Sequence, residues 1–229
     1  MSDSLVVLSV GGSLLNNGKP DADMAAKIAG ALKSAGLPLG IVCGGGQQAR
    51  KKAEKARKKS GSEFEADLAG IKITYKNADC LRKALGPEAG VKVFKDFKAA
   101  RKAALSQKYV LMGGTIPGIT TDADSALLAE ALGAKRLVNL SNTAIYDSDP
   151  RTNPQAKKFS RMGYDELISL ALKGDQRKAG THFVFDMLAC SLIARSKIET
   201  HFVDGRDLAQ IQAAVLGQAH AGTVVCSNP

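Results

Sequence analysis

Three glycine clusters, each placed directly after a short apolar run, are the residues of this sequence best suited to bind phosphate. They are Gly11-Gly12-Ser13 after Leu5–Val10, Gly44-Gly45-Gly46 after Leu39–Cys43, and Gly113-Gly114-Thr115 after Tyr109–Met112. Glycine lets the backbone approach an anion closely, and a helix that begins there offers free N–H groups and the positive end of its dipole. Because the carboxyl ends of parallel strands meet at one edge of a sheet, the clusters predict an anion site at that edge.

One arginine follows the second glycine cluster at helical spacing. Arg50 lies one turn into the helix that we expect after Gly46, where a guanidinium could bind phosphate through two hydrogen bonds. The alternative is that Arg50 begins a solvated basic helix face, which continues to Lys59. That face has no interleaved aromatic residues, and the chain has no recognisable nucleic-acid-binding module, so we expect no nucleic-acid partner. Neither GxxxxGK[ST] nor GxGxxG is present.

Several aspartates have both a structural and a chemical interpretation. Asp122, Asp124 and Asp186 each stand near the start of a predicted helix and could cap it. Asp149 precedes a proline, which is a common turn pair, and Asp67 could be a solvated helix residue. From the residues alone the structural interpretation is favoured for each. The histidines, His182, His201 and His220, are scattered, and we interpret them as surface or loop residues rather than catalysts.

Longer blocks carry a resemblance to a known family. GGGQQAR (Gly44–Arg50), DLAGIKIT (Asp67–Thr74) and GGTIPGITTDADSALLAEALGA (Gly113–Ala134) resemble the amino-acid kinase superfamily. Within it, the uridylate kinases of the archaeal type are similar at YDSDPRTNPQAKKF, AGTHFVFDMLACSLIARS, DGRDL and the terminal GTVV. The resemblance covers nearly the whole chain. It implies an α/β fold, a three-layer αβα sandwich with a mainly parallel central sheet, assembled as a homohexamer.

The same resemblance implies a set of site residues. Arg50 and Asp186 would be catalytic. The residues that would bind the acceptor, UMP, are Gly45, Asp67, Thr115, Ile116, Pro117, Gly118, Ile119, Thr120 and Thr121. Those that would bind ATP are Gly12, Ser13, Gly46, Arg50, Ser141, Asn142, Tyr146 and Asp149. Mg²⁺ would accompany ATP, and no residue is assigned as its ligand.

The implied reaction transfers the γ-phosphoryl group of ATP to UMP, giving UDP and ADP in pyrimidine nucleotide biosynthesis. Phosphoryl transfer depends on positioning and charge neutralisation, and a UMP phosphate is already ionised near neutral pH, so a site without a catalytic histidine suffices. Two alternatives remain. One is another phosphotransferase of the superfamily, with a carboxylate, carbamate or isoprenoid phosphate acceptor. The other is a non-catalytic anion-binding or storage protein on the same fold.

Two departures from the superfamily pattern bear on the ATP site. Many members carry a lysine in a K-x-S-G pattern on the first strand, where this chain has Leu8-Ser9-Val10-Gly11. The loop Ser141–Tyr146 is one residue shorter than the superfamily's T-N-V-D-G-V-Y segment and lacks its Asp and Gly.

These residues must be positioned by alternating strands and helices, which imply βαβ units. Further strands are expected at Val91–Phe94, Leu137–Leu140, Ile198–Val203 and Thr223–Cys226. The expected helices are Asp21–Ala35, Gln47–Lys59, Glu63–Leu85, Asp96–Ser106, Asp122–Leu132, Tyr164–Leu172, Asp186–Ala194 and Asp207–Leu216. We expect residues 1–229 to form one domain, with the acceptor site in the N-terminal part and the ATP site from about residue 137.

Composition is that of a soluble globular protein, with 45% hydrophobic and 24% charged residues among 229. The net charge of +10 is compatible with nucleic acid, membrane surfaces or anionic small substrates and does not choose among them. The four cysteines are scattered without a CxxC pair, which favours reduced thiols. No signal peptide is recognised, and no stretch reaches the roughly 20 apolar residues of a membrane helix. We therefore expect a cytoplasmic protein.

Overall fold

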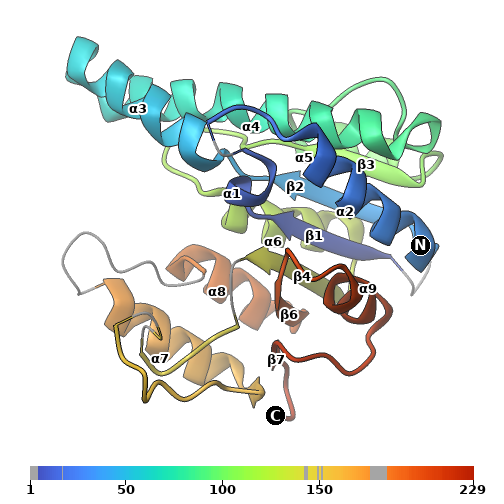
Figure 1. The fold of residues 1–229 in the computed structure, drawn as a ribbon, viewed down its shortest axis with the longest axis vertical. Helices are drawn as coiled ribbons and strands as arrows, with labels where there is room; N and C mark the ends of the chain where they lie inside the picture. The colour runs from blue at the N-terminus through green and yellow to red at the C-terminus, as the bar shows by residue number, and fades with distance from the viewer. Residues whose placement is uncertain (1–4, 17, 142–143, 149, 151, 176–184) are drawn as a thin grey trace.

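The computed structural model describes residues 5–16, 18–141, 144–148, 150, 152–175 and 185–229. Its strands form one sheet in the order β3-β2-β1-β4-β6-β7-β5 (Figure 1). They are β1 (Val6–Val10), β2 (Leu39–Cys43), β3 (Tyr109–Met112), β4 (Arg136–Ser141), β5 (Arg161–Met162), β6 (Glu199–Asp204) and β7 (Thr223–Val225). Neighbouring strands run parallel except β6 and β7, which are antiparallel.

Most of the helices begin at polar caps, and several end at glycines. They are α1 (Gly12–Leu15), α2 (Ala22–Ala35), α3 (Gly46–Ser60), α4 (Glu63–Leu85), α5 (Phe97–Ala103), α6 (Thr121–Leu132), α7 (Tyr164–Asp175), α8 (Met187–Arg195) and α9 (Leu208–Leu216), with a 3₁₀ turn at Pro87–Ala89. Asp21, Ser62 and Asp207 accept backbone N–H groups at the starts of α2, α4 and α9. Gly36 and Gly61 end α2 and α3 in the left-handed conformation that glycine adopts without strain.

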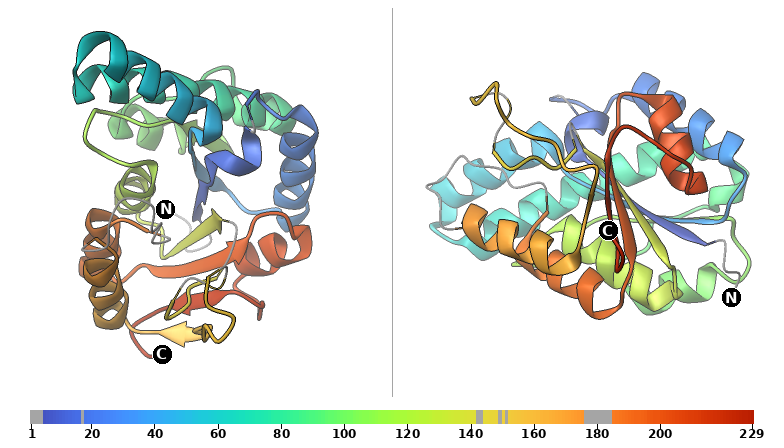
Figure 2. Two further views of the ribbon diagram at one scale, coloured as in Figure 1. Left: turned by 60° about the vertical axis from the view of Figure 1, so that its left-hand side comes forward. Right: turned by 90° about the horizontal axis from the view of Figure 1, so that it is seen from below.

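Two aliphatic cores, one on each face of the sheet, produce three layers. Apolar side chains of α2, α4 and α9 pack on one face, and those of α5, α6, α7 and α8 pack on the other. In the left view of Figure 2, α6, α7 and α8 lie on one side of the strands and α2 and α9 on the other. The prediction of a three-layer αβα sandwich with a mainly parallel sheet is confirmed.

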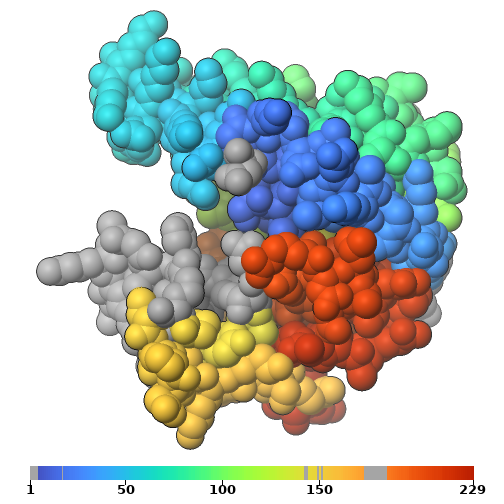
Figure 3. Space-filling model, viewed as in Figure 1, coloured from blue at the N-terminus to red at the C-terminus, as the bar shows by residue number. Residues whose placement is uncertain are grey.

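Helix α3 lies outside these layers. It packs along α4 and has no buried residue, and the space-filling view shows it projecting, in cyan, from the body of the molecule (Figure 3). Exposed ion pairs tie it locally, including Arg57 to Glu63 and Lys58 to Glu54. The basic run is therefore a solvated face over most of its length.

Some expectations were wrong in detail. Val91–Phe94 is not a strand: only Phe94 bridges to β3, at Met112, because Val91 is 88% exposed and the chain reaches the sheet only at Phe94. The two-residue β5, the antiparallel pairing of β6 with β7 and the short α1 were not foreseen. Among the helices described, none is long and apolar enough to cross a membrane.

Candidate phosphate site at the carboxyl edge of the sheet

The glycine loops after β1 and β2 lie against each other at the carboxyl edge of the sheet. A Cβ on Gly12 would lie 2.0 Å from the Gly46 nitrogen, and one on Gly44 would lie 2.7 Å from the Gly12 nitrogen. Gly46 has a φ of +65°, and a Cβ there would lie 2.2 Å from the Gly12 carbonyl oxygen. Distances below 3.0 Å to backbone atoms exclude any side chain, so the two loops are in contact through bare backbone. The prediction that these clusters converge at one edge is confirmed.

A buried amide network fixes the triple-glycine loop from below. Asn77 of α4 donates to the carbonyl oxygens of Gly44 and Gly45, at 2.8 and 3.3 Å. Asn16, which follows α1, donates to the Asn77 side-chain oxygen at 3.0 Å. Both asparagines are fully buried, so their hydrogen bonds replace those with water and specify one loop conformation.

Carboxylates hold the loop from Gly113 to Thr121 at three points. The backbone N–H of Gly118 donates to Asp67 at 2.8 Å. Thr115 donates to Asp124 through both its backbone N–H, at 3.0 Å, and its hydroxyl, at 2.6 Å. At the end of the loop the Thr120 hydroxyl donates to Asp186. The predicted acceptor loop is thus brought together with the predicted residues Asp67 and Asp186. It also lies near Gly45, because Thr74 of α4 packs against Gly45 and accepts from the Gly114 N–H.

The capping interpretation is wrong for two aspartates and correct for the third. Thr120, not Asp122 or Asp124, caps α6, because its hydroxyl already accepts the Ala123 N–H at 3.1 Å. Both aspartates lie in the first turn of α6 and point inward instead. Asp186 does cap α8, accepting the Ala189 N–H at 3.0 Å, while its second oxygen contacts Thr120. Its structural and chemical roles are therefore compatible.

Asp122 occupies a partly buried polar position beneath the site. Ser9 of β1 donates to it at 2.9 Å and Asn139 of β4 donates at 3.3 Å; these two are cross-strand neighbours in the sheet. Burial, with a contribution from the Asp186 carboxylate, raises the pKa of the Asp122 carboxyl to about 7, against the opposing effect of its hydrogen bonds. Burial likewise raises the pKa of Asp124 to about 6. Asp122 is thus a carboxyl that titrates near neutral pH inside the candidate site.

Arg50 lies in the first turns of α3, exposed to solvent. Within the part of the chain that the structure describes, no hydrogen bond or ion pair is seen for its guanidinium. Its position one turn after Gly46 leaves it available to an anion at the loop. Leu8, where the superfamily often has lysine, is fully buried in the core, so β1 presents no cation at that position.

The residues predicted to bind ATP are only partly described. Gly12 and the exposed Ser13 lie in α1, and Ser141 ends β4 beside them on the same edge of the sheet. Tyr146 lies further along, paired with Lys158 in an isolated bridge. Asn142 and Asp149 lie outside the described residues.

The interpretation of the histidines needs correction. His201 is neither a surface nor a loop residue: it lies within β6 and is 3% exposed. His220 is half-buried and contacts it, with 2.7 Å between His201 Nδ1 and His220 Nε2. His182 lies outside the described residues. Both described histidines are distant in the fold from the glycine loops.

Sequence reasoning missed Ser9, Asn16, Thr74, Asn77 and Asn139 as supports of this site. A signal was present for some of them. Asn77 falls on the apolar stripe of α4, four residues after Ile73 and four before Leu81. Ser9 and Asn139 each interrupt an apolar strand. A polar residue at a core position needs a partner, and here the partners are the loops and Asp122.

Together these features define a class: α/β proteins that bind phosphate groups on glycine loops and helix N-termini at the carboxyl edge of a parallel sheet. The family model "Amino acid kinase family" matches residues 4–204. The chain belongs to this family.

Curated relatives and solved structures agree with this family assignment. The chain is similar to the uridylate kinase of Thermococcus onnurineus (strain NA1), 42% identical over 223 residues that cover 96% of this chain and 98% of the relative. It is 38% identical to the uridylate kinase of Archaeoglobus fulgidus, over 96% of this chain and 99% of the relative. The crystal structure of uridylate kinase from Archaeoglobus fulgidus superposes with a TM-score of 0.85 at 36% identity, over 96% of this chain and 99% of that one. The UMP kinase of Bacillus anthracis, at 20% identity and a TM-score of 0.80, shares the fold.

Proposed function

We propose that this chain is a UMP kinase, which transfers the γ-phosphoryl group of ATP to UMP and releases UDP and ADP. The observation that carries the proposal is the convergence of the glycine loops, the acceptor loop 113–121 and the N-termini of α3, α6 and α8 at one sheet edge. The similarity to uridylate kinases over almost the full length supports UMP as the acceptor.

On this proposal the acceptor loop and α4 hold UMP. Gly45 and the residues Thr115–Thr121 surround the nucleotide, and Asp67 holds its ribose. One Asp67 oxygen accepts the Gly118 N–H, which fixes the carboxylate and leaves its other oxygen to accept a ribose hydroxyl. Asp124 and Asp186 keep the threonines at each end of the loop in place. Such prepositioned groups lower the entropic cost of bringing acceptor and donor together.

ATP is proposed to lie across the loops after β1 and β4. Gly12, Ser13 and Gly46 would contact its phosphates through backbone N–H groups, and Ser141, Asn142, Tyr146 and Asp149 would line the rest of its pocket. Arg50 is placed to offset charge on the transferred phosphoryl group, because it is the predicted cation beside the loops and has no competing partner among the described residues. No general base is needed, since the acceptor phosphate is already ionised.

The donor atoms around the site suit a hard cation such as Mg²⁺. The Asp122 and Asp186 carboxylates, the Thr120 hydroxyl and the Asn139 amide provide oxygen ligands, and the Asn139 side-chain oxygen is buried without a partner in the described structure. The described residues contain no cluster of three or more His, Cys, Asp or Glu with metal-site geometry. Mg²⁺ typically binds through one or two carboxylates and the substrate phosphates, and Asp186 is the residue that would hold it. When bound, the ion offsets negative charge on the reacting phosphates.

We further propose that residues 1–229 act as one domain, with acceptor binding before about residue 137 and ATP binding after it, and that the enzyme is a cytoplasmic homohexamer. The proposed interface lies along the 23-residue helix α4, where Phe64 is exposed. Light scattering at micromolar concentration checks the assembly, and a monomer would contradict it.

The reaction is tested with a coupled assay of ADP release from Mg²⁺-ATP in the presence of UMP, CMP, dTMP or AMP. We expect turnover with UMP to exceed that with the others. Turnover only with a carboxylate, carbamate or isoprenoid phosphate acceptor would identify another kinase of the family. ATP binding without turnover of any acceptor by folded protein would indicate a non-catalytic binding protein.

A further inference from the structure

A cavity of about 680 Å³ opens at the amino edge of the sheet, where β1, β4 and β6 begin. This edge is at the opposite end of the strands from the glycine loops. Leu5, Leu37, Leu216 and the ring of Tyr164 give the cavity an apolar part. Its charged lining consists of Lys135, Arg136, Arg161, Lys197 and Glu199. Four cations therefore face one carboxylate.

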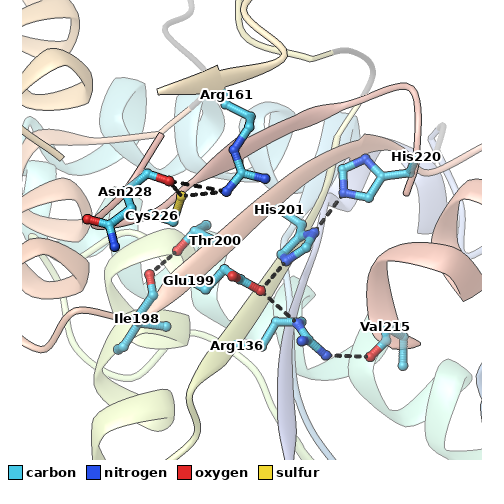
Figure 4. Close-up of polar contacts among 10 residues, drawn as sticks. All are labelled: Arg136, Arg161, Ile198, Glu199, Thr200, His201, Val215, His220, Cys226 and Asn228. Atoms are coloured by element: carbon cyan, nitrogen blue, oxygen red, sulfur yellow. Dashed lines mark hydrogen bonds and ion pairs between the residues drawn. The ribbon is translucent and has the colours of Figure 1, made fainter. Parts of the chain in front are cut away.

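That carboxylate is already engaged. Glu199 accepts from Arg136 Nε at 3.2 Å and lies 2.9 Å from His201 Nε2 (Figure 4). Arg161 donates to two uncharged acceptors, the Cys226 sulfur at 3.2 Å and the Asn228 carbonyl oxygen at 3.3 Å. None of the ion pairs among the described residues includes Lys135, Arg161 or Lys197. Three positive charges around the cavity are thus not offset.

The lining is held in place from behind. Arg136 also donates to the Val215 carbonyl oxygen at 3.3 Å, and its guanidinium fills the space beside Gly217, where a Cβ would lie 2.3 Å from one of its nitrogens. His220 contacts His201, which contacts Glu199, so a line of three side chains fixes the carboxylate that orients Arg136 (Figure 4). Lys197 has a φ of +50°, the left-handed conformation that commonly ends a helix, and the Ile198 N–H donates to the Ile193 carbonyl oxygen of α8 at 3.0 Å, which fixes the backbone at Lys197.

A purely structural explanation covers part of this pattern. Lys135 follows α6 and Lys197 follows α8, and cations are favoured at the negative ends of helix dipoles. That argument does not reach Arg161, which begins β5. It also gives no reason for a hollow of this size between the cations and an apolar wall.

We propose that this cavity binds a phosphorylated small molecule of nucleotide size, at a site separate from the glycine loops. Lys135, Arg161 and Lys197 bind the phosphate oxygens, for which guanidinium and ammonium groups are the usual side-chain donors. Tyr164 and the three leucines pack against the apolar part of the molecule. The volume lies within the roughly 300–1,000 Å³ of small-molecule sites. The proposal does not depend on which reaction occurs at the other edge.

Lysine labelling tests the site locally. The full chain is treated with limiting acetic anhydride in the presence of ATP, inorganic pyrophosphate or, as a control, sodium chloride at matched ionic strength. Acetylation of each lysine is then quantified by peptide mass spectrometry. At a probe concentration about ten times its Kd, ATP slows labelling of Lys135 and Lys197 by roughly tenfold. Exposed Lys102 on α5 is the internal control and is labelled equally in all samples. Pyrophosphate protects more weakly, because it lacks the apolar body.

Variants separate this site from the phosphoryl-transfer edge. Arg161→Ala raises the ATP concentration needed to protect Lys197 by roughly 10- to 150-fold, the loss expected for a charge-assisted contact. Arg101→Ala, which removes an exposed arginine of α5, leaves protection unchanged, and so does Arg50→Ala at the other edge. Melting temperatures confirm that each variant is folded. The proposal is overturned if about 10 mM of either probe, well above a millimolar Kd, leaves the labelling of Lys135 and Lys197 unchanged. It is also overturned if Arg161→Ala does not weaken the protection.

Discussion

The two edges of the same sheet differ in the charge that predominates there, with carboxylates prevailing at one and cations at the other. At the carboxyl edge, where α3, α6 and α8 begin, four carboxylates gather near the glycine loops, with Arg50 of α3 also nearby: Asp67, Asp122, Asp124 and Asp186. At the amino edge, where α6 and α8 end, four lysines and arginines line the cavity with one carboxylate, Glu199. Helix dipoles favour this distribution, since N-termini stabilise anions and C-termini stabilise cations. A phosphate at the carboxyl edge must therefore share helix N-termini with carboxylates, whereas at the amino edge it meets cations directly.

Asp122 at the carboxyl edge and His220, which contacts His201 behind the amino-edge cavity, respond to pH in opposite directions. Burial raises the pKa of Asp122 to about 7, so its ionisation destabilises the fold as pH rises. Burial lowers the pKa of His220 to about 4, so protonation of the unfolded chain destabilises the fold as pH falls.

Asp186→Asn should lower kcat/KM for UMP phosphorylation roughly 100- to 1,000-fold, the usual loss for one positioned electrostatic group. Asparagine caps helices as well as aspartate does, so the melting temperature should stay unchanged. Asp96→Asn is the matched control, since Asp96 caps α5 through the Ala99 N–H at 2.7 Å. Steady-state kinetics that show small, equal effects for both variants would mean that Asp186 is only a helix cap.

Asp122→Asn should stabilise the protein at pH 8 and have little effect near pH 4. The folded state binds the Asp122 proton more tightly than the unfolded chain, so this stability is complete below pH 4 and is lost as pH rises through about 7. A shift of about three pKa units corresponds to a difference on the order of 3–4 kcal/mol between the two pH values. Urea denaturation of both proteins without nucleotide measures it. A difference that does not vary with pH would contradict a buried, titrating carboxyl.

Arg50→Ala should reduce kcat/KM by roughly 10- to 150-fold, because it removes a charge-assisted contact worth about 1.5–3 kcal/mol. The loss falls on kcat if the contact tightens on the moving phosphoryl group and on KM if it holds substrate. Since Arg50 is exposed, stability should not change. Lys58→Ala, further along the same helix, should be near neutral, and equal effects of the two would identify the whole helix face as solvated surface.

His220→Gln should reduce the loss of stability between pH 7 and pH 4.5 while leaving kcat/KM within about twofold of the wild type. The unfolded chain binds a proton near pH 6.5, but the folded protein does so only near pH 4, so wild-type stability falls in that range. The ring is only half-buried, and solvent screening limits the expected difference to about 1 kcal/mol. Denaturant midpoints at several pH values measure it. An unchanged pH slope would contradict the lowered pKa of His220, and a large loss of activity would show that the two edges are not independent.

Much of the fold could be predicted because its strands and helices are marked locally. β1, β2 and β3 are apolar runs that end at glycines, and α4 begins and ends at the predicted residues. Strand direction could not be predicted from the sequence, because an apolar run such as Thr223–Val225 carries no sign of pairing antiparallel to β6. The two-residue β5 is too short to produce a pattern.

The candidate site could be predicted only where it depends on backbone. The glycine loops were recognisable because close approach requires glycine, and their contact at Gly12 and Gly46 follows from parallel strands. Asp122 was misread as a cap because Thr120, two residues earlier, takes that role, and its partners Ser9 and Asn139 come from strands distant in the sequence. Buried polar partnerships of this kind depend on tertiary structure, which no local pattern encodes.

The contact between Gly12 and the Gly44–Gly46 loop limits how the protein can be altered. On the proposed assignment, the first loop holds the donor and the second lies between donor and acceptor, and there is no room for even a methyl group between them. A substitution meant to retune the choice of donor would displace the backbone that receives the acceptor. Donor and acceptor preferences therefore cannot be changed independently at these two loops. Engineering either preference has to proceed through the loop 113–121 or the lining after β4.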